Sequence, residues 1–258
     1  MPDVSIGALR VWQRHRDVML RLWKSEFLGV VVEPFVVIFA LGLGLGKFVE
    51  LESGEEYVVF LMPGLLAMFP MFAAVFECAW GSMVRLQMQG TYQAIIATPV
   101  SVDDVITGEL LWGTTRSVIN ATYILLVALA LDPWLGMVQS PWALLVIPLS
   151  VLPGMLFSAI SMCFVSIARA MSQLSYFFNL VINPMFWFGG AFFPIDQLPG
   201  WARVLAYAVP LTHVVELYRG LVRGDFELVM LVHLAVIFSA TAFFYWLALW
   251  SMRRRLIQ

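Results

Sequence analysis

A glycine-rich stretch at residues 42–47, Gly-Leu-Gly-Leu-Gly-Lys, is the part of the sequence most similar to a nucleotide site. A phosphate-binding loop needs glycine at position 41 and Ser or Thr at position 48 to hold Mg²⁺, but this chain has Leu41 and Phe48. The four-residue spacing of Gly42 and Gly46 favours close helix packing instead. We therefore predict that this chain binds no nucleotide, metal or other cofactor itself.

His213 and Glu216 have the spacing of half a zinc motif. The complete His-Glu-x-x-His pattern is absent, and the chain has only 3 histidines. Arg219 follows Glu216 by three residues, so a local Glu–Arg pair on one helix face is the simpler interpretation. The sequence also lacks a Gly-x-Ser-x-Gly motif and a carboxylate pair suited to acid–base catalysis. These patterns favour a protein without catalytic activity.

Polar side chains within apolar segments are the remaining candidates for function. Glu109, Arg116 and Asn120 share one face of a helix. Ionisable groups are costly in hydrocarbon unless they face a partner or water, so this face should point into the protein. Two interpretations stay open: a polar stripe beside a substrate path, and a structural Glu–Arg pair near the inner headgroups. Further candidates for the substrate path are Asn179, Asn183 and Trp187.

Two other carboxylates and the two cysteines also lie in or beside apolar segments. Glu33 and Glu77 are near segment ends, where each is expected to extend toward the headgroups or to pair with an arginine such as Arg85. Cys78 and Cys163 favour buried structural roles rather than a disulfide.

Long apolar segments must position these residues. The chain is 61% hydrophobic and 12% charged, whereas soluble domains carry about 25% charged residues. Several apolar runs are long enough to cross about 30 Å of hydrocarbon. We predict an all-α integral membrane protein, a single transmembrane domain over residues 1–258, with six transmembrane helices. The predicted spans are residues 28–46, 58–80, 105–131, 142–168, 174–193 and 228–250.

Two further segments are predicted to be helical without spanning the membrane. Residues 7–27 form an amphipathic interface helix, for which a solvated basic arm is the alternative. Its apolar side consists of Leu9, Trp12, Met19, Trp23 and Phe27. Residues 194–224 are interrupted by proline and favour an outer re-entrant helical hairpin between spans five and six. Its marked residues are Pro194, Pro199, Pro210, His213, Glu216 and Arg219.

The distribution of Lys and Arg predicts the orientation of the chain. With the N-terminus in the cytosol, 10 Lys and Arg residues fall on the inner side and 4 on the outer side. The excess of positive charge marks the cytosolic face. An even number of spans then returns the C-terminus to the cytosol as well.

Three stretches carry a family resemblance: GTYQAIIATPVSVDDVITGE at residues 90–109, GGAFFPIDQLP at 189–199 and VPLTHVVELYRG at 209–220. They resemble the membrane subunit of type-2 ABC exporters, and within these the nodulation-type lipo-oligosaccharide exporter permeases. The likeness covers nearly the whole chain. It implies a permease in the bacterial inner (plasma) membrane that exports an amphiphilic substrate such as a lipo-oligosaccharide, glycolipid or polysaccharide. A hydrophobic drug or lipid is the alternative cargo.

The resemblance also implies partners. Two copies of the chain would face each other, and two copies of a separate ATP-binding subunit would hold ATP and Mg²⁺; nothing points to nucleic acid. The loop at residues 98–104 would be the coupling helix that the ATP-binding subunit pushes. Its residues are Thr98, Pro99, Val100, Ser101, Asp103 and Asp104. Asp103 and Asp104 also suit the N-terminus of a membrane helix that begins near Val105.

Two functions from other classes stay open. A membrane-embedded enzyme acting on lipid-linked sugar would need Asp, Glu or His clustered at one membrane face, whereas the charges here are scattered. A passive channel would work without ATP, and the long coupling-like loop argues against it.

Overall fold

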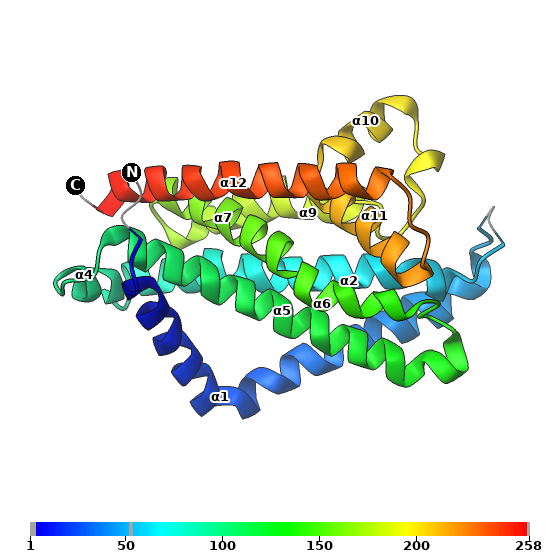
Figure 1. Cartoon of the computed structure of the whole chain (residues 1–258), viewed down its shortest axis with the longest axis horizontal. Coiled ribbons are helices and arrows are strands. Elements are labelled where there is room, and N and C mark those ends of the chain that lie inside the picture. The colour runs from blue at the N-terminus through cyan, green and yellow to red at the C-terminus, as the bar shows by residue number, and fades with distance from the viewer. Residues whose placement is uncertain (1–3, 52–53, 257–258) are drawn as a thin grey trace.

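The computed structural model describes residues 4–51 and 54–256 of the chain, and the side chains of these residues except 24–31. Every regular element in these ranges is helical. Figure 1 shows an elongated bundle with both termini and the short helix α4 (Thr91–Ile96) at one end. Helix α10 (Gly200–Ala208) projects at the opposite end.

Four helical stretches in the described ranges have the length and composition to cross a membrane. They are Tyr57–Gln87, Val102–Leu135, Pro141–Ile167 and Val229–Leu256. The first joins α2 (Tyr57–Phe76), a π-helical turn (Glu77–Gly81) and α3 (Ser82–Gln87). The second is α5, and the fourth is α12. The third joins a 3-10 turn (Pro141–Leu145), α6 (Val146–Leu149) and α7 (Val151–Ile167).

Helix α2 lies at the centre of the bundle. Nearly all of its residues are buried, and it packs against α5, α7 and α11 (Pro210–Arg223). Helix α7 packs mainly on α12, and α5 contacts both α2 and α7. The core therefore lies around α2, and the helices around it keep apolar side chains on their outer faces, as a lipid-exposed bundle does.

Helix α1 (Gly7–Val37) runs without interruption through the predicted interface helix and into the first predicted span. A π-helical turn (Ile38–Gly44) and a 3-10 turn (Leu45–Phe48) continue it. Figure 1 shows a sharp bend between its two halves. A Cβ added to Gly42 would lie 2.8 Å from the Val58 side chain, so the small residue at position 42 does allow the close helix packing expected from the sequence.

The N-terminal half of α1 packs on α5 through a face that the sequence pattern indicated only in part. Ala8, Val11 and His15 are buried there. Of the predicted apolar side, Leu9 and Trp23 are exposed and Trp12 and Met19 are half-buried, and Trp12 Nε1 donates to Thr115 Oγ1 of α5 at 2.8 Å. Phe27 on that side is outside the described side chains. The helix therefore meets α5 through Ala8, Val11, His15 and part of the predicted apolar side, and leaves Leu9 and Trp23 uncovered.

The fifth predicted span, residues 174–193, is a shorter helical stretch that contains a π-helical turn. Its pieces are a 3-10 turn (Met171–Gln173), α8 (Leu174–Phe177), a π-helical turn (Phe178–Ile182) and α9 (Asn183–Phe188). The helix ends at Phe188, before Gly189 and Gly190. A Cβ added to Gly64 of α2 would lie 2.6 Å from the Ala191 carbonyl oxygen, so the chain crosses α2 in close contact.

The segment after the fifth predicted span contains a 3-10 turn (Ile195–Gln197), α10 and α11. Pro199 precedes α10, and Pro210 is the first residue of α11, where a missing backbone N–H costs nothing. Helix α11 packs along α12 and α2, whereas α10 makes few contacts outside α9 and α11. Gly224, with φ of +85°, ends α11 in the left-handed conformation that glycine favours.

Candidate functional site

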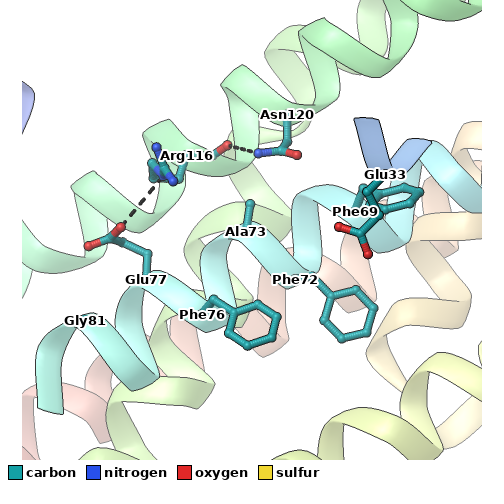
Figure 2. A pocket seen from close by; sticks show the side chains of 9 residues that line it. All are labelled: Glu33, Phe69, Phe72, Ala73, Phe76, Glu77, Gly81, Arg116 and Asn120. Atoms are coloured by element: carbon teal, nitrogen blue, oxygen red, sulfur yellow. Dashed lines mark hydrogen bonds and ion pairs between the residues drawn. The ribbon is translucent and has the colours of Figure 1, made fainter. Parts of the chain in front are cut away.

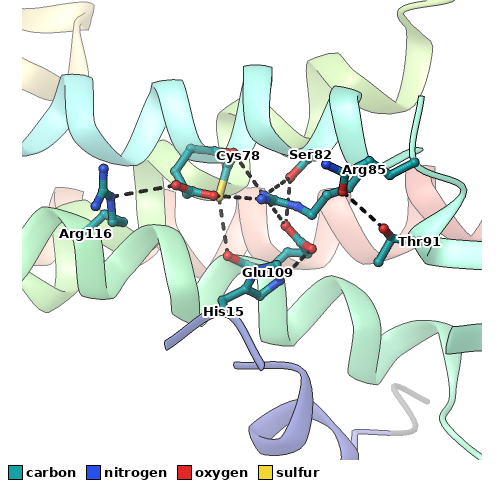
Figure 3. Close-up of polar contacts among 9 residues, drawn as sticks. His15, Cys78, Ser82, Arg85, Thr91, Glu109 and Arg116 are labelled. Atoms are coloured by element: carbon teal, nitrogen blue, oxygen red, sulfur yellow. Dashed lines mark hydrogen bonds and ion pairs between the residues drawn. The ribbon is translucent and has the colours of Figure 1, made fainter. Parts of the chain in front are cut away.

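A fully buried carboxylate lies where α1, α3 and α5 meet. Glu109 has no exposed surface. Arg85 Nη2 donates to Glu109 Oε2 at 2.6 Å, and Ser82 Oγ donates to the same oxygen at 3.0 Å. His15 Nε2 lies 2.9 Å from Glu109 Oε1 and donates to it when that nitrogen carries the proton. These donors offset the cost of burying a charge (Figure 3).

The charged contacts continue from Glu109 toward the middle of the bundle. Arg85 Nη1 donates to Glu77 Oε1 at 2.9 Å. Arg116 Nε lies 3.7 Å from Glu77 Oε2. His15 therefore contacts Glu109, and from Glu109 anionic and cationic groups alternate in the order Glu109, Arg85, Glu77, Arg116. We call this set the charge network.

The charge network decides part of the question left open by the sequence. Glu109 and Arg116 share a helix but do not pair with each other, since each pairs with a residue of Glu77–Gln87. The expected pair of Glu77 with Arg85 is present. His15 is the member that sequence reasoning missed. It is 94 residues from Glu109, and only its spacing from Ala8 and Val11 on one helical face could have indicated burial.

A cavity of about 500 Å³ adjoins one end of the charge network. Helices α1, α2 and α5 and the turn after α2 contribute its walls (Figure 2). The lining residues are Glu33, Phe69, Phe72, Ala73, Phe76, Glu77, Gly81, Arg116 and Asn120. Arg116 and Asn120, both predicted substrate-path residues, line this cavity, and Asn120 Nδ2 donates to the Arg116 carbonyl oxygen at 3.3 Å. Glu109 does not line it.

The other predicted path residues lie on the helical stretch at residues 171–188. Asn183 Nδ2 donates to Asn179 Oδ1 at 3.1 Å, and Trp187 is 55% exposed. The cavity residue Phe76 stacks on Phe178 with ring centroids 4.7 Å apart. Phe72, which also lines the cavity, has its ring 5.3 Å from the Phe186 ring. Aromatic contacts therefore connect the cavity with the segment that carries Asn179, Asn183 and Trp187.

The predicted coupling loop has a buried and an exposed part. Ser101 caps α5, because its Oγ accepts from the Asp104 N–H at 3.0 Å. Asp104 accepts from the Ser5 N–H at 2.6 Å and from Ser5 Oγ at 2.8 Å. Asp103 forms an ion pair with Arg253 of α12. Both carboxylates are buried and bind residues of their own chain.

The exposed part of the coupling loop is the turn between α4 and α5. Thr98 and Pro99 are exposed, and Val100 and Ser101 are half-buried. Met88, 73% exposed, lies just before α4. The Tyr92 ring is fully buried and anchors α4, and this burial raises the pKa of its hydroxyl well above the ordinary value.

The marked residues after the fifth segment form a second polar group at the opposite end. Arg219 Nη1 donates to Glu216 Oε1 at 2.5 Å, which is the local pair expected from the sequence. Arg219 Nη2 donates to the Gly190 carbonyl oxygen at 3.0 Å, so it ties α11 to the chain that follows α9. His213 Nδ1 lies 2.8 Å from His233 Nδ1. Pro194 precedes the 3-10 turn at Ile195–Gln197. In the part of the chain that the structure describes, no three His, Cys, Asp or Glu residues form a potential metal site.

Comparison with known proteins adds to this geometry. Residues 9–222 match the family model described as ABC-2 type transporter. Nodulation protein J of Bradyrhizobium diazoefficiens is 30% identical over 260 residues, covering 100% of this chain and 97% of that protein. Nodulation protein J of Rhizobium meliloti is 29% identical over 259 residues, with coverage of 100% and 97%. The inner membrane transport permease YadH of Escherichia coli is 23% identical over 247 residues, with coverage of 95% and 93%.

Proposed function

The chain belongs to the ABC-2 type transporter family, and from this premise we propose that it is the permease of an ATP-driven exporter. It is a transport subunit and not an enzyme, in keeping with relatives that are named as permeases. In this proposal two copies form a homodimer, and two copies of a separate ATP-binding subunit supply ATP and Mg²⁺. The observation that carries it is the continuous charge network between the α1–α5 contact and the cavity, within a chain of this family.

The proposed topology has six spans in the inner membrane. Four are the long apolar helices. The C-terminal half of α1 with its π-helical turn, and the helical stretch at residues 171–188, would supply the other two. The end that carries both termini and α4 would face the cytosol, since Lys and Arg concentrate there. Helices α10 and α11 would form the outer re-entrant hairpin, and the contacts of α11 with α2 and α12 support this placement.

The proposed coupling surface is the exposed turn at Thr98 and Pro99 together with Met88. ATP binding would favour the closed pair of ATP-binding subunits and shift this turn. Asp104 binds Ser5, and Glu109 binds His15, so α1 and α5 would move together. Arg85 and Glu77 would then pass the shift to Arg116 at the cavity.

The proposed cargo is an amphiphile such as a lipo-oligosaccharide, glycolipid or polysaccharide. A cavity with polar groups on α5 and aromatic rings on α2 supports this, because rings stack on sugars and acyl chains while polar groups bind hydroxyls. A hydrophobic drug or lipid is the second candidate, favoured by the apolar surface of Tyr176, Leu180 and Trp187.

Purification from the native membrane in mild detergent tests the partnership. We expect an ATP-binding subunit to co-purify at one copy per permease and to hydrolyse ATP. Recovery of the chain without any ATP-binding protein, under conditions that keep other ABC transporters intact, would contradict the proposal.

A further inference from the structure

We propose that the cavity between α1, α2 and α5 binds a positively charged, ammonium-type head group of an amphiphile, with Glu33 as its counter-ion. The inference rests on the proposed exporter function, because it names the chemistry of the cargo that this cavity would take. It follows from the charges, the aromatic rings and the size of one cavity (Figure 2).

The described lining of the cavity has more acidic than basic side chains. Its ionisable residues are Glu33, Glu77 and Arg116. Glu77 pairs with Arg116 at 3.7 Å and with Arg85 at 2.9 Å. Glu33 lies on the C-terminal half of α1, and no hydrogen bond or ion pair joins it to another described residue. Among the described side chains of the lining, two carboxylates and one guanidinium give a formal charge of −1, which a monovalent cation would balance.

Glu33 is placed where a lone carboxylate is costly. It lies in a predicted span, and an ionised group at membrane depth needs water or a partner of opposite charge. Its side chain is exposed and borders the cavity. A bound cation would therefore neutralise this carboxylate without displacing a contact that the chain already makes.

The aromatic lining suits the same ligand class. Phe69, Phe72 and Phe76 lie on one side of α2, separated by three and four residues, and all three line the cavity. Ammonium groups are attracted to the negative faces of aromatic rings and are commonly bound by rings together with a carboxylate. A volume of about 500 Å³ also falls within the range of small-molecule sites, about 300–1,000 Å³.

An anionic head group fits the same cavity less well. Arg116 already contacts Glu77, so an anion would compete with that carboxylate and would face Glu33 as a second like charge. A neutral sugar could bind Asn120 but would leave Glu33 without a partner. The cavity should therefore discriminate by charge and not by apolar character alone.

Two ions of matched size and opposite charge test this discrimination. Tetraphenylphosphonium and tetraphenylborate would be equilibrated by dialysis with the purified full-length chain in phosphatidylcholine nanodiscs, and binding to empty nanodiscs subtracted. We expect saturable binding of the cation only. Glu33→Gln should raise the dissociation constant of the cation at least tenfold, while Glu33→Asp keeps most of the affinity. Glu50→Gln, the same change on an exposed loop carboxylate, should leave it unaltered.

The outcomes separate this inference from the exporter function. Equal binding of both ions, or cation binding that Glu33→Gln leaves intact in a variant of unchanged thermal stability, would overturn the head-group site. Dissociation of a dimer by Glu33→Gln, seen as a halved mass, would assign Glu33 to subunit contact and overturn it too. ATP-driven export without charge discrimination would refute only the site. Charge-selective binding in a chain that never exports with ATP would refute the exporter function instead.

Discussion

At the scale of single residues, the contacts of Glu109 explain how a charged carboxylate can be buried inside the bundle. A buried ion pair is weakly stabilising as a whole, but removal of one partner leaves a charge without compensation. Glu109 depends on Arg85, Ser82 and His15 together. Arg85 in turn also binds Glu77. Loss of Arg85 therefore removes the guanidinium that balances the buried Glu109 charge, whereas Glu77 keeps Arg116 as a partner.

We predict that Arg85→Met lowers the free energy of unfolding by about 3–5 kcal/mol, the usual cost of breaking a buried pair. Thermal unfolding in detergent would measure the change. Adding Glu109→Gln to Arg85→Met should restore part of the loss, because the double variant no longer buries the unpaired Glu109 charge. Arg203→Met, on the exposed helix α10, serves as the control. An Arg85→Met protein that unfolds at the wild-type temperature would show that the network does not hold the fold.

Sequence reasoning identified part of this site and missed the rest for a definite reason. Glu109 and Arg116 stood out because charges within apolar segments need partners. The identity of the partner depends on tertiary contacts, and spacing along one helix suggested a Glu109–Arg116 pair that does not form. His15 could not be linked to Glu109 because nothing in a single sequence connects residues 94 positions apart.

At the scale of elements, the residues of the coupling loop have two roles. Some hold the loop to its own chain, and others are exposed and available to a partner. Asp103 and Asp104 hold the start of α5 to Arg253 and Ser5. Thr98 projects from the neighbouring turn and is exposed. The resemblance assigned all of these residues to ATPase coupling without distinguishing them. Because the two aspartates are buried and the turn is exposed, a partner subunit would touch the turn. The aspartates would affect partner binding only by fixing the position of α5.

We predict that Thr98→Lys reduces co-purification with the ATP-binding subunit and leaves the unfolding temperature of the permease unchanged. Asp103→Lys should instead lower the unfolding temperature, because it places a second cation against Arg253 in a buried site. Pull-down and thermal unfolding of the two variants side by side would measure both effects. Normal partner binding by Thr98→Lys, with full ATP hydrolysis, would remove this turn from the interface.

We predict that Gly108→Ala weakens the packing of α1 on α5. An added Cβ would lie 2.6 Å from Val11 Cβ and 2.7 Å from the Ala8 carbonyl oxygen, and overpacking of this kind costs about 1–3 kcal/mol. Gly200→Ala is the matched control, since nothing lies within 4 Å of its added Cβ. Thermal unfolding should separate the two variants. Equal unfolding temperatures would mean that α1 shifts to accommodate the added methyl group without a measurable loss of stability.

The sequence predicted the long apolar helices better than the turns within helices and the point where the fifth one ends. Continuous apolar runs gave the four long helical stretches because length and composition alone define them. Hydrophobic periodicity encodes neither the π-helical turn at Phe178–Ile182 nor the end of the helix at Phe188. The face of α1 that meets α5 was predicted only in part: Trp12 of the predicted apolar side contacts α5, but the buried part of the contact consists of Ala8, Val11 and His15.

At the scale of the whole molecule, polar features gather at the two ends of an apolar bundle. The termini and α4 lie at one end, and α10 lies at the other (Figure 1). An exporter needs two different ends, because its ATP-binding subunit docks on one side of the membrane and its cargo is released on the other. The charge network and the cavity lie between these ends.

We predict that the two ends are accessible from opposite sides of the membrane. In a background with Cys78 and Cys163 replaced by serine, Met88→Cys should react with a membrane-impermeant maleimide only in inside-out vesicles. Trp201→Cys, at the α10 end, should react only in right-side-out vesicles, and both positions are exposed, 73% and 67%. Labelling of both cysteines from one side would contradict the proposed topology.

ATP-driven export by the reconstituted complex tests the central claim most directly. The permease and its co-purified ATP-binding subunit would be placed in liposomes, and movement of a fluorescent glycolipid with a positively charged amino-sugar head group would be followed between leaflets with ATP, without ATP, and with a slowly hydrolysed analogue. We expect transport only with hydrolysable ATP, and its loss in Arg116→Ala, which changes the cavity at the end of the charge network. Glycolipid movement at the same rate without ATP would contradict the exporter assignment and favour a passive channel.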